Sequence, residues 1–308
     1  MAEEDNSNYV LYYYVPNKGA AIFFTIAFIL STCLYAYQVY AAAKRASKQL
    51  RSKRDEFDLT KEPVMVRTGG DVDKKLEIGS IVCCFIPFFI GCVMEAIGYI
   101  ARAVSSSDKE ALTPFIIQTV LLLVAPALYA ATIYMVFGRL LRILRCENLM
   151  LVSSRFGTAF FVSGDVLSFL LQASGGGLMA SAGNTQLGAN LVTAGLVVQI
   201  VFFGFFIINE MKFSIGVSQS CPFYWQISKN WFYVNLTFLV SSVLIMVRSI
   251  VRLIEFIQGH DGFIISHEVF IYVFDAVPML LVAVTFCVGS YLGNIFRVLA
   301  EARGFDRI

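Results

Sequence analysis

Seven apolar stretches dominate this chain and restrict its fold more than any other feature. They occupy residues 19–42, 78–101, 114–138, 156–175, 187–208, 231–257 and 269–293. A helix of about 20 residues crosses the hydrocarbon core of a bilayer, so each stretch is long enough to span it. Lipid offers no hydrogen-bond partner to the backbone, so each stretch is expected to be helical. The sequence therefore predicts an all-α polytopic membrane protein, a bundle of seven transmembrane helices.

The composition excludes two other classes of protein. Apolar residues make up 57% of the 308 positions and charged residues 15%, whereas a soluble domain has about 25% charged residues. A chain with so few charges has too much apolar surface to remain disordered in water. The net charge of +2 gives no electrostatic reason to bind nucleic acid, so membrane lipids are the expected surroundings.

Lysine and arginine are distributed unequally between the two sides of the predicted bundle. Nineteen of the 24 fall on one side, ten of them in the connection 44–75, and three fall on the other side. Positive residues favour the cytosolic side, so we expect the N-terminus outside and the C-terminus in the cytosol. This gives an extracellular segment 1–18, a membrane domain 19–293 with a charged, mobile cytosolic loop at 44–75, and a cytosolic tail 294–308.

Six charged side chains fall inside the expected spans, where a charge costs roughly 2.5–3.5 kcal/mol on insertion scales. They are Glu95, Asp165, Arg248, Arg252, Glu255 and Asp275. Asp165 falls near mid-depth and the other five in the outer half, and their spacing places Arg248, Arg252 and Glu255 on one helix face. Two interpretations remain open: these charges neutralise one another between helices, or they form a headgroup site for an amphiphile.

Prolines and glycines indicate irregular helices. Three prolines fall inside the spans: Pro87, Pro126 and Pro278. Each is expected to bend its helix and free a carbonyl group, and the run of three glycines from Gly175 is expected to end the fourth span. Irregular backbone at that depth must face protein or water, which favours a cavity. The amides of Gln172 and Gln199 fit hydrogen bonds either between helices or to a ligand.

Signatures of an enzyme are missing from the sequence. It has two histidines, too few for the usual catalytic zinc site. It also has no phosphate-binding loop, dinucleotide fingerprint or nucleophile elbow. We therefore expect no enzymatic activity, no metal site and no cofactor.

Several motifs, in this order, resemble those of a known family. They are Tyr14-Val15-Pro16, the segment from Glu95 to Arg102, Ala125-Pro126-Ala127, Asp165-Val166-Leu167-Ser168 with Gln172, Ile207-Ile208-Asn209-Glu210, and the segment from Arg248 to Glu255 followed by Asp275. The chain resembles the fungal RTA-like proteins, the lipid-translocating exporter family, over nearly its whole length. The motif that ends at Glu210 is similar to the porphyrin-handling branch.

This resemblance implies a plasma-membrane protein that moves amphiphiles or confers resistance to them. The first hypothesis it supports is a transporter or facilitator for protoporphyrin uptake and haem efflux. The alternatives are translocation of, or resistance to, sterol-like or sphingoid-base lipids, either directly or as a seven-helix sensor that regulates other lipid pumps. The expected substrate contacts are Glu95, Asp165, Gln172, Arg248, Arg252, Glu255 and Asp275.

Overall fold

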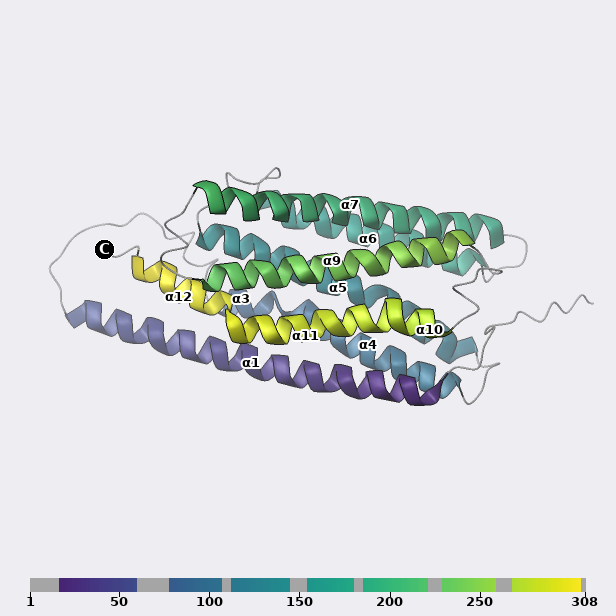
Figure 1. The fold of residues 1–308 in the computed structure, drawn as a ribbon, viewed down its shortest axis with the longest axis horizontal. Coiled ribbons are helices and arrows are strands. Elements are labelled where there is room, and N and C mark those ends of the chain that lie inside the picture. Colours follow the sequence, from purple (N-terminus) through teal and green to yellow (C-terminus); the bar gives the residue numbers. More distant parts are fainter. Residues whose placement is uncertain are drawn as a thin grey trace, which may run out of the picture.

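The computed structural model describes residues 17–59, 78–106, 112–144, 154–179, 185–220, 229–258 and 268–305, and these are almost entirely helical. The helices, with the labels of Figure 1, are α1 (Lys18–Leu59), α3 (Ile78–Cys83), α4 (Ile86–Ser105), α5 (Leu112–Ile143), α6 (Ser154–Met179), α7 (Thr185–Ser220), α9 (Asn230–Gln258), α10 (Glu268–Ile271), the π-helix η2 (Tyr272–Ala276), α11 (Val277–Leu292) and α12 (Ile295–Phe305).

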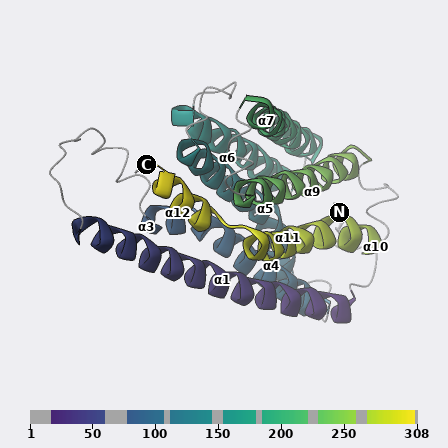
Figure 2. The same cartoon turned by 60° about the vertical axis from the view of Figure 1, so that its left-hand side comes forward.

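The long helices form a closed ring that follows the order of the chain. Each of α1, α4, α5, α6, α7, α9 and α11 packs on the next, and α11 returns to pack on α1. A contact between α5 and α9 crosses the ring. Figures 1 and 2 show the helices running along one another, with α10 at one end of the bundle and α12 at the other. We call these the α10 end and the α12 end; the sequence predicts that the α10 end is extracellular.

The outward surface of the bundle fits a membrane. In the described part of the chain, six helical segments are long and apolar enough to cross a bilayer. The seventh long helix, α6, has 26 residues but is more polar, because it includes serines, glycines, Asp165 and Gln172. Large apolar side chains such as Leu30 and Val201 face outward with more than half of their surface exposed. The structure therefore confirms the predicted all-helical, polytopic fold.

Glycines allow the helices to approach closely. The prediction that the run of three glycines ends the fourth span was wrong. The run of three glycines from Gly175 does not end the fourth span, because α6 continues to Met179. A Cβ atom on Gly175 would lie 2.6 Å from the carbonyl oxygen of Gly188 on α7. Gly175 is therefore a packing residue of the α6–α7 contact, in which small residues let two backbones touch.

The three prolines in the spans have different effects. Pro87 lies in the first turn of α4, directly after the break that separates α3 from α4. Pro278 lies in the first turn of α11, directly after the π-helix η2. Pro126 lies inside α5, whose helical conformation is continuous. The sequence predicted irregular backbone at all three prolines; the structure has it at Pro87 and Pro278, whereas α5 is continuously helical through Pro126.

Two predicted connecting segments begin as helix. α1 extends to Leu59, well past the expected start of the charged loop at Lys44, and it projects beyond its neighbours in Figure 1. The remaining loop residues, 60–75, lie outside the described part. The expected tail at 294–308 contains α12, whose Ile295 and Phe296 are buried and which packs on α1, α5 and α9. Apolar residues in this segment explain why it docks on the bundle.

Candidate functional site

The five charges that the sequence placed in the outer half meet near the α10 end, in what we call the Arg248 cluster. Its members are Glu95, Arg248, Arg252, Glu255 and Asp275. Asp275 forms ion pairs with both arginines: Arg248 contacts one carboxylate oxygen, and Arg252 reaches the other at 3.0 Å. Arg252 also pairs with Glu255 at 3.2 Å, and Arg248 donates a 2.6 Å hydrogen bond to the carbonyl of Leu122.

An irregular backbone presents Asp275 to the arginines. Asp275 lies in η2, the π-helix that joins α10 to α11. Pro278 has no N–H group, so the regular hydrogen bond to the carbonyl four residues earlier cannot form. Single π-helical turns of this kind occur often at functional sites, because they insert an additional residue and change the direction of the neighbouring side chains.

Glu95 gives the cluster an excess of carboxyl groups. It is only 1% exposed, and its Oε1 atom has no hydrogen-bond partner among the described residues. Asp275 and both arginines lie close enough to act on it electrostatically. Three carboxyl groups thus face two guanidinium groups in a site where an uncompensated charge is costly.

A stack of aromatic rings adjoins the Arg248 cluster. Phe24 of α1 stacks on Tyr272 of η2 at a centroid distance of 5.5 Å, and Phe28 stacks on Tyr99 of α4 at 5.8 Å. Tyr99 follows Glu95 by one helical turn and lies close enough to Arg252 to interact with it electrostatically. The bundle therefore brings flat apolar faces next to buried cations.

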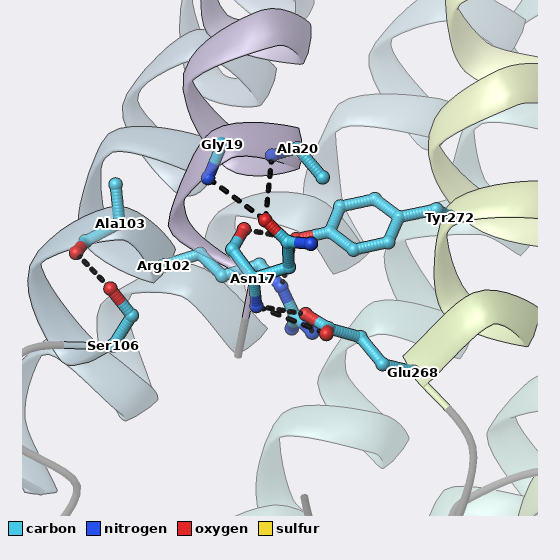
Figure 3. A network of polar contacts seen from close by, with 8 residues as sticks. All are labelled: Asn17, Gly19, Ala20, Arg102, Ala103, Ser106, Glu268 and Tyr272. Atoms are coloured by element: carbon cyan, nitrogen blue, oxygen red, sulfur yellow. Dashed lines mark hydrogen bonds and ion pairs between the residues drawn. The ribbon is translucent and has the colours of Figure 1, made fainter. Parts of the chain in front are cut away.

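A second polar network joins three helices at the α10 end. Figure 3 shows its four residues, which we call the Arg102 latch: Asn17, Arg102, Glu268 and Tyr272. Arg102 pairs with Glu268 at 3.0 Å and donates to the hydroxyl of Tyr272 at 3.1 Å. The backbone N–H of Asn17 donates to Glu268 at 2.8 Å, and the Asn17 side chain accepts hydrogen bonds from the first turn of α1. The latch fixes the start of α1 against α4 and α10.

The sequence did not predict this latch, because Arg102 falls one residue past the expected second span, 78–101. In the structure, Arg102 is only 2% exposed. Its spacing could have revealed this, since Arg102 follows Glu95 by seven residues and so shares its helix face.

Asp165 and Gln172 do not join the Arg248 cluster. Asp165 of α6 is buried and faces the hydroxyl group of Tyr134 on α5. Gln172 donates to Ser168 at 2.7 Å and to Gln199 of α7 at 3.2 Å, so it takes part in a contact between helices. A ligand-binding role for these two residues stays a prediction.

Glu210 is a buried acid that sequence reasoning did not count as intramembrane. The fifth span was expected to end at residue 208, but α7 continues to Ser220 and Glu210 is completely buried. Its two carboxyl oxygens have no hydrogen-bond partner of acceptable geometry, although the hydroxyl of Ser242 on α9 lies against them. The motif that ends at Glu210 was the one available signal.

The described cavities lie away from the Arg248 cluster. One, of about 30 Å³, lies towards the α12 end and is lined by residues that include Tyr35, Phe238, Phe286 and Phe296. A smaller one, of about 10 Å³, adjoins Tyr134. In the described part of the chain, no three His, Cys, Asp or Glu residues are grouped to hold a metal ion. A cavity around the cluster itself remains a prediction.

Comparison with known proteins decides the family. A family model described as RTA1 like protein matches residues 88–298. The chain is 58% identical to Protein RTM1 of Saccharomyces cerevisiae, over 98% of each chain. It belongs to the RTA1-like family. This RTA1-like chain is also 57% identical, over 97% of each chain, to Protoporphyrin uptake protein 1 of the same yeast.

A more distant yeast relative of this RTA1-like chain is the Sphingoid long-chain base transporter RSB1, which is 27% identical over 65% of this chain and 62% of its own. No solved structure matches. The region matched by the family model contains the whole Arg248 cluster and, of the Arg102 latch, all but Asn17. The geometry above therefore belongs mainly to the part of the chain that defines the family.

Proposed function

We propose that this chain is a plasma-membrane transporter or facilitator of amphipathic molecules, with protoporphyrin as its first substrate, and that it moves this substrate without converting it. The observation that carries the proposal is the 57% identity, over nearly the full chain, to a protein named for protoporphyrin uptake. The charges and rings near the α10 end support it.

Arg252 is the residue best placed to exchange partners with a substrate carboxylate. Its side chain is 21% exposed, whereas that of Arg248 is 5% exposed. One of its partners is Glu255, which lies on the same helix and is itself 13% exposed. A propionate-like group that replaces Glu255 leaves the guanidinium paired, and the displaced Glu255 carboxylate would need water or a proton in its place. The planar guanidinium also suits bidentate hydrogen bonding to a carboxylate.

The aromatic stack suits the remainder of such a substrate. Phe24, Tyr99 and Tyr272 come from three different elements and pack on one another beside the cluster, so a substrate would have to separate these rings to stack on them. A flat macrocycle gains both buried area and ring stacking at such a place. One site could then satisfy both the charged edge and the apolar face of a porphyrin.

Purified protein in liposomes tests the proposal. We expect fluorescent protoporphyrin to equilibrate several-fold faster into liposomes with the protein than into empty ones. Arg252→Gln should slow it markedly in protein that is still folded. Lys212→Gln, which removes an exposed positive charge on α7, is the matched control and should keep the wild-type rate. Equal rates with and without protein would refute transport by this chain.

A second candidate is translocation of a sphingoid base. It is favoured by the excess of carboxyl groups in the Arg248 cluster, which suits an ammonium headgroup, and by the relative named as a sphingoid base transporter. The same liposomes separate the candidates, because a labelled sphingoid base would then equilibrate faster while protoporphyrin would not. If neither moves but lipid handling in cells depends on the protein, a regulatory role is favoured.

A further inference from the structure

Glu210, like Asp165, is a buried acid whose carboxyl oxygens have no hydrogen-bond partner of acceptable geometry among the described residues. It lies ten residues before the end of α7, about 15 Å from that end of the helix. Its side chain is completely buried, and the group that lies against it is the hydroxyl of Ser242. An ionised carboxylate in this position would be far more costly than the paired carboxylate of Asp275.

The elements packed around Glu210 bring no charge that would neutralise it. On α9, the facing residue is Ser242. On α6 and α5, Asp165 and Tyr134 face each other, and further along α5 Arg139 and Arg142 lie close enough to Cys84 to act on it electrostatically. On α7 itself, Lys212 is exposed. Among the described residues, therefore, no arginine, lysine or second carboxylate pairs with Glu210.

A line of polar side chains on α9 passes Glu210. Asn235, Ser242 and Ser249 follow one another at seven-residue intervals, so they lie on one face of the helix, and all three are buried. Asn235 donates a hydrogen bond to Ser214 of α7, one turn from Glu210 towards the α12 end. In the other direction, Arg248 follows Ser242 by six residues, about 9 Å along the axis. Buried polar side chains of α9 thus lie on both sides of Glu210, towards the α12 end and towards the Arg248 cluster.

The donor set at Glu210 suits a proton better than a metal ion. A bound calcium or magnesium ion takes about six oxygen ligands, and Glu210 with Ser242 supplies three. A protonated carboxyl group needs only one acceptor for its O–H, and the Ser242 hydroxyl lies against it. Carboxyl groups of this kind inside membrane bundles often form proton relays.

We propose that Glu210 binds and releases a proton during the transport cycle, so that movement of the substrate is coupled to H⁺. The proposal rests on the proposed transport function. On release, the O–H bond of the carboxyl group breaks and a water molecule entering from the α12 end takes the proton as hydronium. On rebinding, hydronium returns the proton to the carboxylate. Ser214 and Asn235 orient water along this route.

Transport driven by a pH gradient tests the coupling. In liposomes, an imposed pH gradient should change the initial rate of protoporphyrin uptake by wild-type protein several-fold. Glu210→Gln, which imitates the protonated group, should make the rate the same at every gradient. Glu210→Asp, which keeps a carboxyl group, should retain a response. A Glu210→Gln variant that responds to the gradient as wild type does would overturn the proposal.

Two neighbouring serines offer a matched pair of variants. Ser241 and Ser242 are both completely buried on α9, and neither hydroxyl has a hydrogen-bond partner of acceptable geometry. Ser242 is the one that lies against Glu210. We expect Ser242→Ala to shift the midpoint of the pH response and Ser241→Ala to leave it in place. Equal shifts in both variants would contradict the assignment.

An infrared measurement separates this inference from the transport proposal. The C=O stretch of a protonated carboxyl group is resolved from that of a carboxylate, so titration of the protein in lipid shows whether Glu210 exchanges its proton. We expect a pH-dependent band that is missing in Glu210→Gln and present in Glu255→Gln. If the band is present but no substrate moves, the transport proposal fails and the proton site stands. If no band is assigned to Glu210 at any pH, the proton site fails, whatever the rate of transport.

Discussion

Asp275→Asn tests whether the Arg248 cluster holds the bundle together. The substitution keeps the size of the side chain but removes the negative charge that both arginines share. Arg248, whose side chain is 5% exposed, then loses its ionic partner and keeps its hydrogen bond to the carbonyl of Leu122. Breaking a buried ion pair by removing one partner costs about 3–5 kcal/mol. That is a large share of the roughly 5–15 kcal/mol that stabilises a typical domain.

Arg252→Gln provides the comparison. Arg252 is one-fifth exposed, and its loss leaves Asp275 paired with Arg248. Glu255, its other partner, is 13% exposed and so retains some access to solvent. Because Asp275 keeps Arg248 as its partner, this variant should be more stable than Asp275→Asn.

The double variant Arg248→Met with Asp275→Leu separates lost charge from lost packing. Replacing a buried ion pair by apolar side chains of similar volume is often neutral. We therefore expect the double variant to recover most of the stability lost in Asp275→Asn while transport remains impaired.

Thermal unfolding of purified protein, followed by tryptophan fluorescence, and abundance in the membrane measure these effects. We expect Asp275→Asn to unfold at a clearly lower temperature and to be depleted from the membrane. The reasoning is refuted if Asp275→Asn is as stable as Arg252→Gln, or if the double variant is no more stable than Asp275→Asn.

Three further predictions follow from individual contacts. Gly175→Ala should lower the free energy of unfolding by about 1–3 kcal/mol, because its Cβ would meet backbone atoms of α7. Gly176→Ala, whose Cβ meets nothing within 4 Å, should leave stability unchanged, and thermal unfolding of both variants checks this. Tyr272→Phe should lower the free energy of unfolding by about 1 kcal/mol, because it removes the hydroxyl that accepts a hydrogen bond from Arg102. An unchanged unfolding temperature would count against the latch. A tag placed after Ile308 should be digested by protease added to cytosolic-side-out vesicles, and protection of the tag would reverse the predicted orientation.

The sequence alone was sufficient for the architecture. Apolar stretches of spanning length leave a chain one class of fold, because in lipid the backbone must satisfy its own hydrogen bonds. Two single residues, Pro87 and Pro278, also predicted irregular backbone, since proline lacks the N–H group that a regular helix needs. The same reasoning did not hold at Pro126, where α5 continues. The spacing of Arg248, Arg252 and Glu255 placed them on one face, because helical periodicity is a local property.

Only the tertiary structure decided which residues meet between helices. Asp275 joins the arginines whereas Asp165 does not, because the order and rotation of helices in the ring depend on the packing of many side chains at once. The same packing buries Arg102 and Glu210, which sequence reasoning had placed outside the spans, because a helix does not end where its apolar stretch ends. Sequence pattern sets the period of each helix, but the partner of a buried charge depends on which helix face is opposite, and that is a property of the assembled bundle.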